Sequence, residues 1–266
     1  MIARSWTSAR SLVLVCGLFA SAAFVTVSAQ GPGARQGGPP PSGRAGAPVD
    51  LTGTWAAVIT EDWQWRMVTP KKGDAASVPL NAEGTRVTNA WDPATDGSCK
   101  AYGVGGLMRM PLRVRISWQD DNTLAIESDA GQQKRLIHFG NVPAPSGERT
   151  LQGHSVGEWV GGGRGSLDPF TGRGDGPGQQ GWGSLRVRTT GMRAGWLRRN
   201  GVPYSENAVV TENFMRFTHP DAGDWFVVTT TVEDPTYLAQ PFVTSSNFKK
   251  EPNDAKWNPT PCKESF

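Results

Sequence analysis

Two residues on one expected strand have side chains that could carry acid–base chemistry. The stretch 151–160 reads LQGHSVGEWV, and the alternation of a strand places His154 and Glu158 on the same face. A neutral imidazole beside a carboxylate is a workable general base. Because this spacing spans about 13 Å of strand, the two side chains cannot hydrogen-bond to each other, and each needs a partner on a neighbouring strand. The alternative is structural, with the histidine lining the polar interior of a barrel.

His138 and Glu212 complete the candidate catalytic set. His138 lies in the strand pattern 132–140, on the face opposite its two apolar neighbours, and the alternative for it is a histidine of the surface or of a polar network. His219 lies in an expected hairpin turn, so a metal site built from histidines is not predicted. The sequence predicts neither a metal nor a cofactor.

A dense polar cluster follows in the chain and supplies candidate ligand-binding residues. It reads YSEN at 204–207 and TEN at 211–213. Ser205 is not expected to be a nucleophile, because no Gly-x-Ser-x-Gly elbow surrounds it. We instead expect Glu206 and Glu212 to form ion pairs with arginines, such as Arg109, Arg115 and Arg135. The predicted ligand-binding residues combine this cluster with residues elsewhere: Glu61, Arg66, Arg109, Arg135, Tyr204, Glu206 and Tyr237.

Positioning these side chains requires a sheet, and the pattern along the chain predicts one. Alternation at 112–118, 123–128 and 132–140, with tight Asp/Asn/Gly turns between, is typical of an antiparallel β-meander. Further strand patterns lie at 56–70, 151–160, 183–190, 208–217, 224–234 and 240–250. The clearest helix pattern is 80–91, with Asn81 as its expected N-cap. The fold class is therefore all-β: a single antiparallel lipocalin-like β-barrel with one short helix, or alternatively a β-sandwich.

The first 48 residues are expected to lie outside this domain. Residues 1–29 have two arginines, an apolar run and a small-residue cleavage site, which is typical of a secretory signal peptide. Residues 30–48 are rich in Gly and Pro and predict a disordered linker. The barrel domain then covers 49–266, with a flexible Gly-rich excursion at 161–181. A membrane anchor at the start is the alternative, although the apolar run is short for a span.

The net charge argues against one class of partner, and the cysteines indicate the compartment of the protein. The chain is formally +3, and because four arginines and no acidic residue precede Val49, the domain itself is −1. A nucleic-acid-binding domain needs a basic stripe, so this class is not expected. Cys16 leaves with the signal peptide, and Cys99 and Cys262 are expected to pair, as cysteines of exported proteins commonly do. A bridge across so long a loop is worth about 5 kcal/mol in the chain-entropy model.

Several of these segments together resemble a known group of proteins. The Gly-x-Trp at 53–55 resembles the opening strand of lipocalin-like barrels. The elements GHSVGEW, SLRVRTT, SEN, TEN and DP, in order over about residues 50–262, resemble an exported bacterial family of unknown function. The chain departs from that family where Gly161 to Gly181 replaces a tight Glu-Gly-Asp turn. The resemblance implies an exported β-barrel domain and no particular activity.

Three functions fit these observations. The first is a periplasmic or secreted barrel that binds a small apolar or aromatic molecule, since tryptophans are spread over many strands. The second is an acid–base enzyme, an isomerase or hydrolase, that uses His154 or His138 with Glu158 or Glu212. The third is a structural protein of the envelope. No stable membrane insertion is expected, and the oligomeric state is left open.

Overall fold

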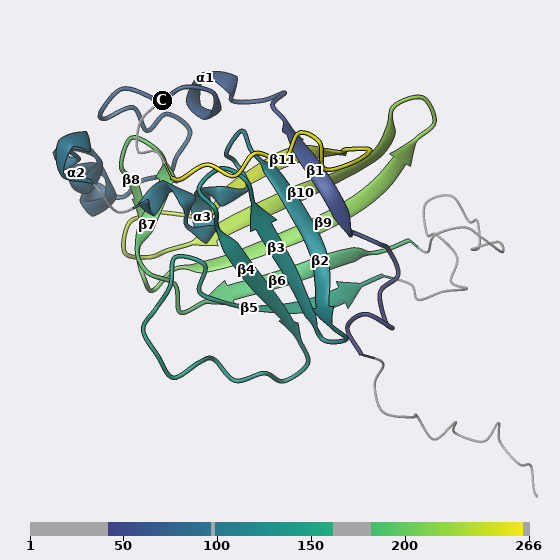
Figure 1. Cartoon of the computed structure of the whole chain (residues 1–266). Coiled ribbons are helices and arrows are strands. Elements are labelled where there is room, and N and C mark those ends of the chain that lie inside the picture. Colours follow the sequence, from purple (N-terminus) through teal and green to yellow (C-terminus); the bar gives the residue numbers. More distant parts are fainter. Residues whose placement is uncertain (1–41, 97–98, 162–181, 263–266) are drawn as a thin grey trace, which may run out of the picture. The chain divides into compact units, whose positions relative to one another are not determined.

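Nine strands of the computed structural model close into a β-barrel (Figure 1). The structure describes residues 42–96, 99–161 and 182–262. In order around the barrel the strands are β1 (Gly53–Val58), β11 (Phe242–Lys250), β10 (Gly223–Glu233), β9 (Val209–His219), β6 (Ser184–Thr190), β5 (His154–Val160), β4 (Lys134–Phe139), β3 (Thr123–Ser128) and β2 (Arg113–Asp120). β2 pairs with β1 and closes the ring. The predicted all-β barrel is confirmed, and the β-sandwich alternative is wrong.

Strand pairing in the barrel is antiparallel except between β4 and β5. There Ile137 pairs with Ser155 and Phe139 with Gly157 in the parallel sense. The expectation of a wholly antiparallel barrel is therefore wrong at this seam. Tight turns force neighbouring strands to be antiparallel, whereas the long connection 140–153 lets the chain return and enter β5 in the direction of β4.

Helix α2 (Ala82–Ala90) forms where the sequence predicts a helix. The Asn81 side chain accepts a hydrogen bond from the Gly84 backbone N at 2.9 Å, as an N-cap does. Glycine fits at position 84 because a Cβ there would lie 2.4 Å from the Tyr237 carbonyl oxygen. Shorter helical segments were not predicted: α1 (Trp63–Arg66), α3 (Val104–Leu107), η1 (Pro93–Thr95) and η2 (Lys100–Tyr102).

The first strand is shorter than the sequence predicts. β1 ends at Val58, and the remainder of the expected strand 56–70 leaves the sheet and forms α1. Asp62 takes a left-handed backbone conformation (φ 52°) just before this helix, and Arg66 at its end is buried. The segment has the aromatic-rich composition that is typical of a strand, but its packing outside the sheet decides its conformation.

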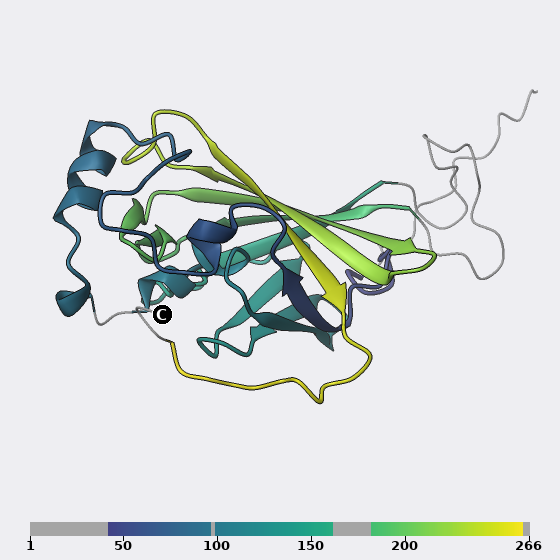
Figure 2. The ribbon, with the colours of Figure 1, turned by 90° about the horizontal axis from the view of Figure 1, so that it is seen from above.

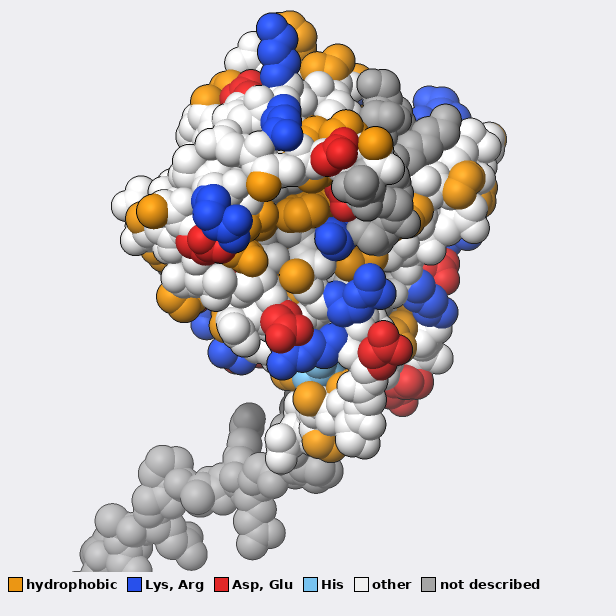
Figure 3. All heavy atoms as spheres, turned by 90° about the vertical axis from the view of Figure 1, so that its left-hand side faces the viewer, with side chains coloured by type: hydrophobic (Ala, Val, Ile, Leu, Met, Phe, Trp, Pro, Cys, Tyr) orange, Lys and Arg blue, Asp and Glu red, His pale blue; other side chains and the backbone are white. Residues whose placement is uncertain are grey.

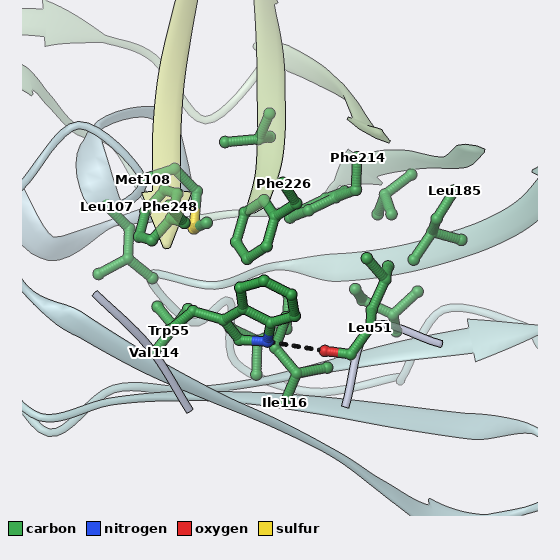
Figure 4. Close-up of a cluster of buried hydrophobic side chains, with 14 of the residues drawn as sticks. Leu51, Trp55, Leu107, Met108, Val114, Ile116, Leu185, Phe214, Phe226 and Phe248 are labelled. Carbon is green, nitrogen blue, oxygen red and sulfur yellow. Dashed lines mark hydrogen bonds between the residues drawn. The ribbon is translucent and has the colours of Figure 1, made fainter. Parts of the chain in front are cut away.

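Aromatic and aliphatic side chains fill the middle of the barrel (Figure 4). Trp55 is fully buried and donates from Nε1 to the Leu51 carbonyl at 2.9 Å, which is the dashed contact in Figure 4. Its ring lies edge-on to Phe226 at 4.9 Å, and Phe226 stacks on Phe248 at 4.7 Å. Burial of each such ring contributes roughly 1.5–3 kcal/mol. The space around Trp55 is thus a packed core.

The helices and a separate hairpin gather at one end of the barrel, which we call the helical end. The hairpin pairs β7 (Gly195–Arg198) with β8 (Val202–Tyr204). Figures 1 and 2 show it beside α2 and α3, while the β9–β10 turn projects at the opposite end. A second apolar cluster, containing Val104, Leu197 and Tyr204, underlies the helical end. On the face in Figure 3, hydrophobic side chains gather near the centre, with Lys and Arg side chains around them.

The predicted cysteine pair ties the C-terminal segment to the domain. Cys99 and Cys262 form a disulfide with their Cα atoms 5.7 Å apart, across 163 positions of sequence. Thr260 reinforces this attachment through backbone hydrogen bonds with Asp129 (3.0 Å) and Gly131 (2.9 Å). The cysteine pairing is confirmed.

Segment 42–48, which the sequence assigns to the linker, contacts the barrel. Gly43 N donates to Asn122 Oδ1 at 2.8 Å, and Trp159 Nε1 donates to the Gly43 carbonyl at 2.6 Å. The expected signal peptide, the earlier part of the linker and positions 162–181 of the excursion lie outside the described residues. In the described part of the chain, no helix is long and apolar enough to cross a bilayer.

Candidate functional site

The two candidate catalytic side chains of the GHSVGEW motif point away from the barrel interior. β5 alternates as predicted, with His154 and Glu158 on the outer face. Glu158 is exposed and pairs with Arg186 at 3.1 Å. Glu212, by contrast, is fully buried inside the barrel. The barrel wall therefore separates Glu212 from His154 and Glu158, and the candidate catalytic residues do not share one site.

His138 and His154 stack on the outer face of the parallel β4–β5 seam. Their ring centroids are 5.6 Å apart and their planes differ by 23°. His154 Nε2 lies 3.1 Å from the Val142 carbonyl oxygen. Burial lowers the pKa of His138, the charge of His154 lowers it further, and Asp120 partly opposes both effects. The two histidines are thus neighbours of each other, and Glu158 is engaged elsewhere.

Arg135 and Glu212 pair with each other inside the barrel. Arg135 Nη1 lies 2.5 Å from Glu212 Oε2, and both side chains are at most 1% exposed. Arg135 also donates from Nε to Ser155 Oγ at 2.9 Å and from Nη2 to Thr189 Oγ1 at 2.7 Å. Burial raises the pKa of Glu212, and the charge of Arg135 opposes that rise. The expected ion pair of Glu212 is therefore present, and its polar network joins β4, β5, β6 and β9.

The YSEN and DP segments meet at a buried carboxylate. Asp234 accepts a hydrogen bond from Ser205 N at 2.6 Å and another from Ser205 Oγ at 2.8 Å. It also accepts from Thr236 N at 3.1 Å. These contacts fix the connection between β8 and β9 against the end of β10. The motif is explained locally by this turn and needs no ligand.

Three other predicted ligand-binding residues do not converge on one place. Tyr204 is fully buried, a Cβ on Gly105 would lie 2.8 Å from its ring, and burial raises its pKa. Glu206 is exposed beside Arg149, with Arg149 Nη1 3.6 Å from its carboxylate. Tyr237 is half-buried beside α2, where its carbonyl accepts from Asn81 N at 2.9 Å.

Glu61, Arg66 and Arg109, in contrast, do come together at the helical end. Arg66 forms an ion pair with Glu61 and donates from Nε to the Arg109 carbonyl at 2.9 Å. Arg109 Nη2 pairs with Asp62 at 2.9 Å. A small cavity of about 10 Å³ lies here, which we call the arginine pocket; it is lined by Trp65, Arg66, Ala101, Gly106, Arg109, Met110, Leu197, Arg198 and Arg199.

Burial and mutual repulsion perturb the cations of the arginine pocket. Burial lowers the pKa of Arg66 to about 10; Glu61 raises it and Arg109 lowers it further. Burial also lowers the pKa of Arg198, again with a contribution from Arg109, against the opposing charges of Asp62 and Asp74. Since a pKa of about 10 is well above neutrality, Arg66 stays charged there. The pocket therefore presents positive charge to whatever enters it.

The sequence does not single out Arg198 and Arg199 as site residues, because the stretch GWLRRNGVPY (195–204) lies between the expected strands at 183–190 and 208–217. The segment folds instead into the β7–β8 hairpin, with Gly201 at φ 80° in its turn. The Asn-Gly pair between two short apolar runs was the available signal for that hairpin. Its tandem arginines are both buried, at 4% and 3% exposure, which local sequence does not show.

A second hollow at the helical end is built around two tryptophans. Trp91 Nε1 and Trp196 Nε1 both donate to Asp96 Oδ2, at 2.9 and 2.6 Å. Lys100 Nζ lies 4.8 Å from the centre of the Trp196 ring. The hollow holds about 250 Å³, and we call it the tryptophan hollow; its lining is Arg86, Val87, Ala90, Trp91, Asp92, Asp96, Lys100 and Trp196.

A wider hollow of about 480 Å³ lies over the outer wall of the barrel. Its lining is Val156, Gly157, Glu158, Arg186, Arg188 and Thr211. The floor is the face of β5, β6 and β9, with the Glu158–Arg186 ion pair across it. This lining offers charge but no aromatic ring, so it suits an apolar or aromatic ligand less well than the tryptophan hollow does.

Comparison of the chain with protein-family models, with curated proteins and with solved structures finds no match. Among the described residues, no group of three or more His, Cys, Asp or Glu side chains is placed to hold a metal ion. The candidate function therefore depends on the geometry of the hollows.

Proposed function

We propose that the protein is an exported β-barrel that binds a small aromatic molecule in the tryptophan hollow. The observation that carries this proposal is the fixing of two indole rings by one carboxylate, beside a hollow of about 250 Å³. A closed apolar cavity of about 150 Å³ is enough for benzene, so this hollow has room for a small ring system. Export is supported by the expected signal peptide and by the disulfide.

The hollow has the composition that favours a flat ligand. Asp96 holds both indole N–H groups, so neither ring of Trp91 or Trp196 can turn without breaking a hydrogen bond. Val87 and Ala90 of α2 supply the aliphatic part of the lining, and Lys100 and Arg86 supply cations. A ligand with an aromatic ring and a polar substituent would contact both kinds of surface.

The alternative functions have less support. An acid–base enzyme would need His154 or His138 close to Glu158 or Glu212. In the described residues Glu212 is inside the barrel, bound by Arg135, and Glu158 is paired with Arg186 on the outside. A purely structural role would not explain why two indole rings are held in fixed orientations beside a hollow. Kinship with the exported bacterial family remains our proposal, and it rests on the order of the GHSVGEW, SLRVRTT, SEN, TEN and DP motifs in the sequence.

Fluorescence titration with 2-naphthol, a neutral aromatic probe, tests the binding proposal. We expect saturable binding by the parent protein and at least a tenfold weaker affinity for Ala90→Phe, about 1.4 kcal/mol, because the new ring fills the hollow. Ala82→Phe is the matched control, since Ala82 is exposed on the same helix and does not line the hollow. Equal affinity in parent and Ala90→Phe, or no saturable binding by the parent, contradicts the proposal.

A further inference from the structure

Arg198 is a buried cation whose own surroundings leave it incompletely neutralised. Arg198 is 4% exposed, and none of its three guanidinium nitrogens has a hydrogen-bond partner within the described chain. Its guanidinium group lies over the Trp65 ring, whose centre is 4.8 Å from its Cζ. A buried guanidinium without hydrogen bonds is costly, because desolvation is not offset by a partner.

The neighbouring arginines also have donor groups left over in the same pocket. Arg66 uses Nη1 for Glu61 and Nε for a carbonyl, and Arg109 uses Nη2 for Asp62. Arg66 Nη2 and Arg109 Nη1 are buried with no hydrogen-bond partner within the described chain. Both residues line the cavity together with Arg198. Several charge-assisted donors thus surround one small space.

The local charge is unbalanced in the direction that attracts an anion. Glu61 and Asp62 are engaged by Arg66 and Arg109, respectively. Asp74 accepts a hydrogen bond from Trp65 Nε1 at 2.9 Å, and Arg198 forms no ion pair with any described carboxylate. The four arginines that line the cavity outnumber the three carboxylates beside them, Glu61, Asp62 and Asp74, so one further negative charge would balance the cluster. A dianion would exceed this requirement.

The size of the cavity limits what can enter. Its volume of about 10 Å³ corresponds to the space that holds roughly one water molecule. A halide ion, or the oxygen end of a carboxylate, is of this size, whereas a ring system is not. Guanidinium groups recognise such oxygens through their paired N–H donors.

We propose that the arginine pocket binds a compact monoanion, either a free ion or the carboxylate end of a small molecule, with Arg198 as its principal partner. This site is separate from the tryptophan hollow, because it has a different lining and prefers a different chemistry. The proposal does not depend on the aromatic ligand proposed above.

Thermal unfolding of the full chain in different sodium salts tests the proposal. Chloride and formate are titrated at constant ionic strength, with bulky methanesulfonate as the balancing salt. Each tenfold rise in anion above its Kd should raise the parent Tm by about 3 °C or more. A response to both anions indicates a free-ion site, and a response to formate alone indicates a carboxylate site.

Variants at Arg198 decide whether this pocket is responsible. Arg198→Met should lose this rise of Tm with anion concentration, and Arg198→Lys, which keeps charge but not the paired donors, should need at least a tenfold higher anion concentration for the same rise. Arg188→Met is the matched control, because Arg188 is exposed on the outer wall of the barrel. If Arg198→Met does not fold, Arg198→Lys decides the question.

Two outcomes overturn the anion site. One is a parent protein whose Tm does not rise with the concentration of either anion. The other is a rise of Tm that Arg198→Met, or Arg198→Lys where the methionine variant does not fold, retains with the parent's slope and onset concentration. Binding of 2-naphthol should be unchanged in the folded Arg198 variants, and the anion response should persist in Ala90→Phe. Failure of one site is therefore distinguishable from failure of the other.

Discussion

At the scale of single residues, burial decides what each charged side chain does. Glu158 and Glu212 are both glutamates on strands, but Glu158 is exposed beside Arg186, whereas Glu212 is fully buried beside Arg135. Exposed pairs contribute about 0–1 kcal/mol to stability. A buried pair is costly to break, since the remaining charge has no solvent around it. The same residue type therefore has a negligible effect at one position and a large one at the other.

The Arg135–Glu212 pair gives a residue-scale prediction. Glu212→Leu should lower the free energy of unfolding by about 3–5 kcal/mol, because it leaves Arg135 charged and buried. The double variant Arg135→Met/Glu212→Leu should recover much of that loss, since both charges are removed and the volume is kept. Urea denaturation of the single variants, the double variant and the parent measures this. Additive losses in the double variant contradict a coupled pair.

At the scale of elements, the parallel β4–β5 seam brings two histidines together. His138 and His154 lie on adjacent strands, and their rings are stacked. The lowered pKa of His138 means that the folded protein binds its proton less readily than the unfolded chain does. Stability is therefore lost as pH falls from the ordinary histidine value of about 6.5 through the lowered pKa.

The lowered pKa of His138 predicts how thermal unfolding depends on pH. The parent Tm should be lower at pH 5 than at pH 7.5, and His138→Gln should reduce that difference by a few degrees or less, since His138 is partly exposed. His219→Gln is the control, because His219 lies at the end of β9, away from this seam. An unchanged pH dependence in His138→Gln, with a clear one in the parent, rules out His138 as the source.

At the scale of the whole molecule, one covalent link joins distant parts of the chain. The Cys99–Cys262 disulfide closes a loop that contains most of the barrel. Cys99→Ser/Cys262→Ser should cost about 2–5 kcal/mol, which corresponds to roughly 5–20 °C in Tm. Differential scanning calorimetry with and without dithiothreitol measures it, and the reduced parent should match the double variant. An oxidised parent that is no more stable than the double variant contradicts this role.

The sequence predicted the all-β class, α2 and the cysteine pair, because each depends on local alternation, a local cap or a residue count. It favoured a barrel over a β-sandwich, and the tertiary structure decided between them. The sequence did not determine β1, where 56–70 has the composition of a strand but Asp62 turns the chain into α1. It also did not determine the direction of β5, since a long connection permits either sense. Local signals thus fix elements whose neighbours are close in sequence.

The sequence alone placed His154 and Glu158 on one face of a strand, and that alternation is what the structure has. Only the tertiary structure decided that this face is the outer one, because closure of the barrel selects the side that is buried. Likewise, it brought Arg66, Arg109 and Arg198 from three distant segments to one cavity. Charge at such a pocket is a property of spatial neighbours, and a one-dimensional pattern of residues does not contain it.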